Sequence, residues 1–168
     1  MPKGLKQTSS LIQISTEVQE TAPNTFTVAQ VDLQLNPLDN EVFVVQAIDL
    51  DLLPPDLVPA TATVSALSLS STSRATVAGI DQTNVLAAKR INTQDTGASA
   101  VTNEYVATDT PASNLEYIAI IATNDFFLNI EGTNNVNPMA ANARVYGYRA
   151  RADAAVYAAL VQSEALSA

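Results

Sequence analysis

Residues 41–53 read EVFVVQAIDLDLL, and this stretch alternates its side chains with the two-residue period of a β-strand. One face would hold Phe43, Val45, Ala47, Asp49 and Asp51, and the other would hold Val42, Val44, Gln46, Ile48, Leu50 and Leu52. We predict that the second face is the core face. Pro54 and Pro55 end the strand, because proline has no N–H to donate to a sheet.

Similar patterns predict further strands on both sides of this stretch. They lie at residues 25–35, 61–68, 75–80, 84–91, 103–107, 115–121, 125–130 and 143–150. Residues 115–121, LEYIAII, are apolar on both faces, which predicts a central strand. Turn signals separate the strands at 36–40 (NPLDN) and 131–135 (EGTNN), and residues 92–100 are predicted to be a long polar loop.

The two ends of the chain differ from this body. Residues 1–24 are rich in Gln, Ser and Thr, and we predict an N-terminal arm there that orders on contact with a neighbour, with one short strand at 11–15. At the other end, Asp153 can cap a helix, and strong helix formers follow it. This pattern predicts a helix over residues 153–166.

The number and spacing of the predicted elements indicate the fold class. Roughly seven to nine short strands, separated by turn signals every 8 to 14 residues or so, are typical of an antiparallel sandwich and not of alternating βαβ units. We therefore predict an all-β fold, a β-sandwich or single jelly roll over residues 25–168, closed by the C-terminal helix.

The chain has few charges, and those it has are mostly negative. Charged residues make up 15% of the sequence, against about 25% in typical domains. A neutral polar surface of this kind favours self-association. The net charge is −9 and Lys and Arg form no cluster, so we expect no direct binding to nucleic acid. Arg144, Arg149 and Arg151 are the one local basic patch through which an anionic membrane could be contacted, although a solvated or interface cluster is the favoured interpretation.

Two residue types that enzymes use most often are absent. The chain contains no Cys and no His, which excludes disulfides, a thiolate nucleophile, an imidazole base and the commonest transition-metal ligands. We therefore predict that the protein is not an enzyme. The apolar run at residues 11–14 is too short for a secretory signal, and no run approaches the ~18 apolar residues of a membrane span. The expected location is a cytoplasm, or a particle made there.

Acidic residues around Pro54 and Pro55 form a weak candidate metal site. Asp49 and Asp51 share one predicted strand face, and Asp56 follows the turn, so they could offer oxygens to Ca²⁺ together with a neighbouring carboxylate. A solvated strand face is the favoured alternative, because the spacing matches no calcium-binding motif. No other cofactor is predicted.

Aromatic and Arg side chains are densest near the C-terminus. The segment 146–149, YGYR, precedes the helix that carries the next aromatic residue. Tyr and Arg are enriched where subunits meet. The predicted interface residues are Tyr146, Tyr148, Arg149, Tyr157, Leu160 and Val161. The alternative is a last strand packed under a C-terminal helix, and both interpretations can hold together.

The chain combines a polar arm, an all-β body and a short helix at the end of the segment ARVYGYRARADAAVYAALVQSEAL (143–166). This combination resembles the single jelly-roll capsid subunits of small icosahedral viruses and phages. The resemblance is architectural, covers most of the chain and includes no diagnostic motif. It implies a self-assembling shell protein located in the virion, with itself and a second coat protein as candidate partners. Residues 1–22 lack the Arg-rich arm of many genome-packaging capsids, which suits a shell over a membrane or a second protein layer.

Two other functions stay open. An adhesin, spike or fibre-like binding module would remain a small oligomer and keep a groove with exposed aromatic side chains. A small enzyme or carbohydrate-binding domain is less favoured, because five Tyr, four Phe and no Trp provide few rings on which a sugar could stack.

Overall fold

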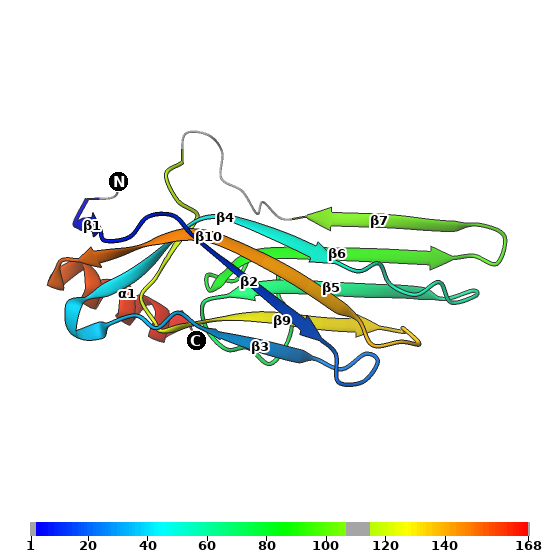
Figure 1. Ribbon diagram of the computed structural model, residues 1–168. Helices are drawn as coiled ribbons and strands as arrows, with labels where there is room; N and C mark the ends of the chain where they lie inside the picture. The colour runs from blue at the N-terminus through cyan, green and yellow to red at the C-terminus, as the bar shows by residue number, and fades with distance from the viewer. Residues whose placement is uncertain (1–2, 107–114, 168) are drawn as a thin grey trace.

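Two antiparallel β-sheets pack face to face in the computed structural model, which describes residues 3–106 and 115–167 (Figure 1). Sheet A contains β1 (Leu5–Gln7), β2 (Ile12–Gln19), β4 (Glu41–Leu52), β8 (Ala119–Ile121) and β10 (Ala140–Ala152). Sheet B contains β3 (Thr27–Asp32), β5 (Ala62–Ser70), β6 (Val85–Asp95), β7 (Ala100–Val106) and β9 (Asp125–Thr133). A short 3₁₀ helix, Pro37–Asp39, precedes β4, and helix α1 (Ala154–Ser167) follows β10.

The order of the strands is that of a jelly roll. In sheet A, β10 lies between β4 and the successive strands β1 and β2, and β8 borders β4. Sheet B has the order β3-β9-β5-β6-β7. Apart from β1–β2, β5–β6 and β6–β7, each connection between consecutive strands leads from one sheet to the other, so that each sheet interleaves early and late strands as two Greek keys require. The predicted all-β jelly roll is confirmed, and β7 is an extra strand at the edge of sheet B.

The main hydrophobic core fills the space between the inner faces of the two sheets. Phe43 and Ile48 of sheet A and Phe126 and Leu67 of sheet B are fully buried there. A second, smaller cluster lies on the outer face of sheet A, where α1 covers the strands. Sheet A is therefore apolar on both faces at the α1 end.

A β-bulge in β4 corrects the predicted core face. The pairing with β10 shifts register so that Tyr146 opposes Ala47 and Gly147 opposes Val45, which leaves Gln46 unpaired. An extra residue reverses the alternation beyond it. The main core therefore receives Phe43 and Val45 before the bulge and Ile48, Leu50 and Leu52 after it, while Val42 and Val44 join the second cluster. The prediction was correct only beyond Gln46.

The predicted N-terminal arm at residues 1–24 is wrong for most of its described length. β1 and β2 are strands of sheet A, paired along β10 from Leu5, opposite Ala152, to Gln19, opposite Ala140. The inward side chains of β2 pack against the main core, and the polar ones between them point to solvent. Those solvent-facing residues gave the segment its arm-like composition, and the sandwich begins near Leu5, not at residue 25.

Three local predictions are also wrong. Residues 115–121 form no central strand, because the strand covers only Ala119–Ile121 and lies at the edge of sheet A, with Leu115 58% exposed. Residues 75–80 form no strand. The predicted loop at 92–100 is occupied in part by β6, which continues to Asp95 and turns directly into β7. For β8 and β6 the pairing with a partner strand, not the local sequence, decided the length.

The C-terminal helix is confirmed within one residue of its predicted bounds. Asp153 caps it, since its Oδ1 accepts a hydrogen bond from the backbone N of Val156 at 2.8 Å. Across residues 3–106 and 115–167, no helix combines the length and the apolar character that crossing a bilayer would require.

Candidate subunit-contact site

The six predicted interface residues lie on β10 and α1, at the end of the sandwich where the helix covers sheet A (Figure 1). They divide into three environments: a cluster beneath the helix, a polar network around Arg149, and the outer face of sheet A around Tyr146. The structure therefore does not bring all six together.

The cluster beneath α1 contains four of the six residues. Tyr148 of β10 is 6% exposed and packs with Tyr157, Leu160 and Val161 of the helix. Burial, followed by the negative charge of Glu116, raises the pKa of the Tyr148 hydroxyl. These contacts confirm that the last strand packs under the helix. Because the three helix residues are only half-buried, their role at a subunit contact stays a prediction.

Glu164 fixes the far end of the helix against the sheet. Its Oε1 accepts a hydrogen bond from the backbone N of Ala122 at 3.0 Å, and its Oε2 accepts one from Thr123 at 2.8 Å. The side chain is 9% exposed, so the two backbone donors replace the water that the carboxylate loses. The helix is thus held in place at both ends of its apolar face.

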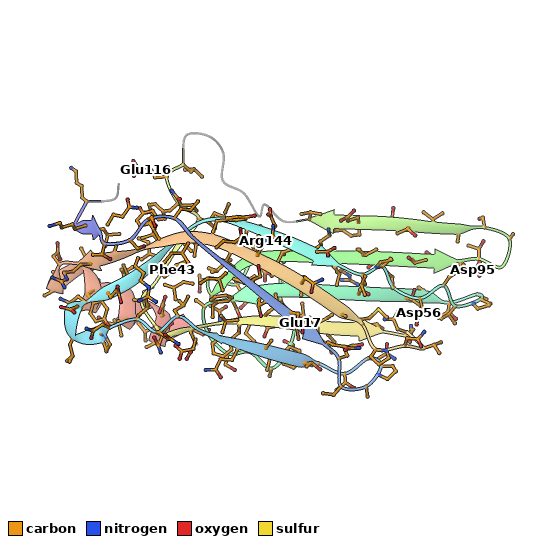
Figure 2. All side chains as sticks on the ribbon, viewed as in Figure 1. Glu17, Phe43, Asp56, Asp95, Glu116 and Arg144 are labelled. Carbon is orange, nitrogen blue, oxygen red and sulfur yellow. The ribbon has the colours of Figure 1, made fainter. Side chains whose placement is uncertain are left out.

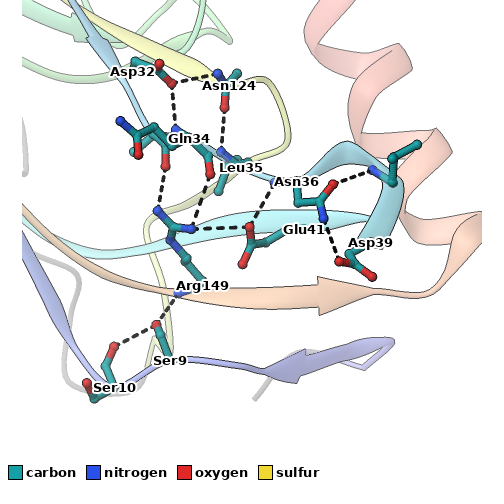
Figure 3. A network of polar contacts seen from close by, with 12 residues as sticks. Ser9, Ser10, Asp32, Gln34, Leu35, Asn36, Asp39, Glu41, Asn124 and Arg149 are labelled. Atoms are coloured by element: carbon teal, nitrogen blue, oxygen red, sulfur yellow. Dashed lines mark hydrogen bonds and ion pairs between the residues drawn. The ribbon is translucent and has the colours of Figure 1, made fainter.

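Arg149 is bound within the molecule (Figure 3). Its guanidinium donates to the carbonyl oxygens of Leu33 at 2.9 Å and Gln34 at 3.3 Å, and it lies 3.5 Å from a carboxylate oxygen of Glu41. Its backbone N donates to Ser9 Oγ at 2.9 Å. Arg149 therefore joins the β1–β2 connection and the β3–β4 connection to β10.

The predicted basic patch of Arg144, Arg149 and Arg151 does not form. Arg144 lies on the outer face of sheet A, whereas the other two alternate with the residues of the second cluster and so lie on the opposite face of β10. Arg151 forms an ion pair with Asp39 at 2.7 Å. Two of the three charges are thus paired with carboxylates, which removes the argument for membrane contact through this segment.

The outer face of sheet A has a hollow beside Arg144, and Figure 2 labels Arg144 and Glu17, two of the residues that line it. The hollow has a volume of about 860 Å³, and Glu17, Asp49 and Asp51 line it together with Arg144. Arg144 donates a hydrogen bond to the Tyr146 hydroxyl at 3.5 Å, which, with the charge of Asp49 as a lesser cause, raises the pKa of the guanidinium. Three of the four charged residues that line the hollow are acidic.

The three calcium candidates do not share a site. Asp56 Oδ2 accepts hydrogen bonds from the backbone N of Asn137 at 2.7 Å and of Val136 at 2.9 Å, and these bonds lower its pKa. Asp49 and Asp51 lie on the outer face of sheet A. Among the residues that the structure describes, no three carboxylates come together in a way that could hold a metal. The geometry gives the calcium prediction no support.

A second hollow, of about 820 Å³, lies on the outer face of sheet B and was not predicted. Its walls are mainly small apolar side chains of β5 and β6, with Arg90, Tyr105 and Glu131 at its margins and residues 77–80 at one side. The sequence signal that could have revealed it is the row of small residues facing outward from these strands.

Comparison with known proteins gives structural matches alone. No family model matches the chain, and no curated protein matches its sequence. The solved structure of Desmodium yellow mottle tymovirus aligns over 90% of this chain and 86% of its own, with 9% identity and a TM-score of 0.32. The empty head of turnip yellow mosaic virus aligns over 88% and 85%, with 9% identity and a TM-score of 0.30.

A third match is the tailspike protein gp49 of Acinetobacter baumannii bacteriophage Fri1, a capsular polysaccharide depolymerase, which aligns over 72% of this chain and 20% of its own with 11% identity and a TM-score of 0.18. The assignment of a jelly roll rests on the strand order of the chain itself.

Proposed function

We propose that this protein is a structural subunit that assembles with copies of itself into the shell of a virus or phage particle. The observation that carries the proposal is the strand order, because viral capsid domains are among the proteins built on a jelly roll with two Greek keys. Its site of action would be the virion, and a second coat protein is a further candidate partner.

The composition supports a structural role on this fold over a catalytic one. The chain has no His and no Cys, so catalysis would depend on carboxylates, hydroxyls, Lys or Arg alone. The carboxylates that line the hollow of sheet A, those of Glu17, Asp49 and Asp51, are exposed to solvent. The low charge content leaves a surface whose neutral polar and apolar groups suit contact between subunits.

A binding module of a virion or cell surface is the second candidate. The hollow on sheet B favours it, since Tyr105 and Arg90 at its margin could contact a ligand. Jelly rolls also occur in lectins. This candidate requires a small, stable oligomer, whereas a shell subunit requires an assembly that grows and closes.

The mass and shape of the purified protein distinguish these candidates. We expect light scattering on a sizing column to show large assemblies, and negative-stain microscopy to show rings, capsomers or closed shells. If only a small fraction of the protein assembles at low salt, high salt should increase that fraction, because the net charge of −9 opposes contact between copies at low ionic strength. A monodisperse monomer under all these conditions would favour the binding module.

The predicted interface on α1 can be tested with Tyr157→Asp. We expect it to raise the protein concentration needed for assembly at least about tenfold, because it places a charge in a half-buried aromatic contact. Ala158→Asp is the matched control, since it adds the same charge at an exposed position of the same helix. Circular dichroism checks folding. If folded Tyr157→Asp assembles like the unmodified protein, Tyr157 is not at a contact.

A further inference from the structure

Strand β7 is an edge strand that no part of the described molecule covers. It lies last in sheet B, pairs with β6 alone, and extends beyond the strands of sheet A (Figure 1). All seven of its residues are exposed, including Val101 at 53%, Tyr105 at 58% and Val106 at 52%. One row of backbone N–H and C=O groups on this strand is therefore available for another strand.

The edge lacks the features that keep natural edge strands apart. Such strands usually carry Lys or Pro, or an unpaired charge that points into the approaching strand. The sequence AVTNEYV contains neither Lys nor Pro. Its one charged residue, Glu104, forms an ion pair with Lys89 of β6 at 2.7 Å, which neutralises it within the sheet. A second strand can approach without meeting a free charge.

We propose that β7 pairs in antiparallel fashion with β7 of a second copy of this chain, about a two-fold axis at Asn103, so that sheet B continues across both copies. When a strand pairs in antiparallel fashion with the same strand of a second copy, the numbers of any two opposing residues add up to the same total. With Asn103 opposite Asn103, all seven residues of β7 find partners, Val101 lies opposite Tyr105, and Ala100 lies opposite Val106.

Charge and side-chain pairing select this register. The pairing between Val101 and Tyr105 joins a β-branched to an aromatic residue, which stabilises antiparallel strands, and both lie on the same face. Glu104 lies opposite Thr102. Moving the axis to Glu104 would place two carboxylates directly opposite each other, and moving it to Thr102 would leave Tyr105 outside the paired strand. The occupant that fits the edge is thus a second copy.

This inference deepens the proposed function and rests on its self-association, because it names one contact through which copies would meet. The experiment uses cysteine variants of the full chain, which has no native Cys. Asn103→Cys brings two thiols to directly opposite positions, with Cβ atoms roughly 4.5–5.5 Å apart. Thr102→Cys and Glu104→Cys place the thiols on a diagonal, roughly 7–8 Å apart. Gln30→Cys, on β3 at the other edge of sheet B, is the control.

We expect a short thiol-specific cross-linker to dimerise Asn103→Cys at least about tenfold faster than Gln30→Cys. A tenfold ratio is what we expect if β7 associates with its copy at least about tenfold more strongly than β3 does. The two diagonal variants should react at intermediate rates. Faster reaction of Thr102→Cys or Glu104→Cys than of Asn103→Cys overturns the register. Equal rates for Asn103→Cys and Gln30→Cys overturn the pairing itself.

A charge variant tests the same contact without a cross-linker. Asn103→Asp places two carboxylates on the two-fold axis, and we expect the dimer dissociation constant in sedimentation to rise at least about tenfold. Asn92→Asp is the control, because Asn92 lies opposite Asn103 on β6 and its side-chain oxygen already accepts from Arg90 Nε at 2.9 Å. An equal effect of the two substitutions contradicts the proposal.

The outcomes also separate this inference from the proposed function. If shells form and Asn103→Cys does not cross-link above the control, the shell function stands and the β7 pairing is wrong. If Asn103→Cys cross-links rapidly and no particle larger than a dimer forms, the β7 pairing stands and the shell function is wrong.

Discussion

Replacement of Glu20 by alanine is expected to lower the free energy of unfolding by roughly 2–6 kcal/mol. Glu20 follows β2 and is 3% exposed. Its Oε1 accepts hydrogen bonds from the backbone N of Gly132 at 2.6 Å and Thr25 at 3.1 Å. Its Oε2 accepts them from Met139 at 2.7 Å and Asn24 at 3.3 Å.

The carboxylate therefore joins the connection between β2 and β3 to the end of β9 and to the connection between β9 and β10. Each of these connections leads from one sheet to the other. Removing it leaves the N–H groups of Gly132 and Met139 buried without an acceptor, at about 1–3 kcal/mol each. Glu20→Gln is expected to have a smaller effect, because one oxygen is kept while the other is replaced by an NH₂ group that faces donors.

Glu17→Ala is the matched control for Glu20→Ala. Glu17 lies three residues earlier, on β2, with an exposed side chain, so its removal should change stability by no more than about 0.5 kcal/mol. Urea unfolding followed by circular dichroism measures all three variants. Equal midpoints for Glu17→Ala and Glu20→Ala would show that the buried carboxylate does not hold the two connections together.

The substitution Gly147→Ala is expected to cost about 3 kcal/mol, the upper end of the usual range for overpacking. A Cβ atom at this position would lie 2.6 and 2.7 Å from two ring carbons of Phe43 and would also collide with the backbone carbonyl oxygen of Val44. Phe43 is 1% exposed and belongs to the main core, so it cannot move aside freely.

The cost at Gly147 arises from lack of space and not from backbone conformation, since its φ angle is not in the left-handed region. Gly79→Ala is the matched control. There, the nearest atom to a new Cβ is the Oδ1 of Asp81 at 3.0 Å, on an exposed side chain that can rotate away. Thermal unfolding should show a clear decrease for Gly147→Ala and little change for Gly79→Ala. Similar melting temperatures would mean that the bulge adjusts to the methyl group.

The sequence by itself determined the elements whose signals are local. A two-residue period predicted the strands at 41–53, 125–130 and 143–150, and the cap at Asp153 with the helix formers after it predicted α1 within one residue. The sequence also placed Tyr148, Tyr157 and Leu160 in one group, and they pack together beneath α1, while their role at a subunit contact stays a prediction.

Only the tertiary structure decided the features that depend on pairing between distant segments. The bulge at Gln46 lies where the pairing passes from Tyr146 to Gly147 of β10, so the core face of β4 changes where no local pattern shows it. The sequence of β2 suggests a polar arm, whereas the structure pairs it with β10. The sequence around Asp56 suggests a calcium ligand, whereas in the structure its carboxylate accepts hydrogen bonds from the backbone of residues 136–137. The physical reason is that side-chain periodicity is a property of neighbours along the chain, whereas strand register and the acceptors of a carboxylate are fixed by contacts between residues about 80 to 130 positions apart.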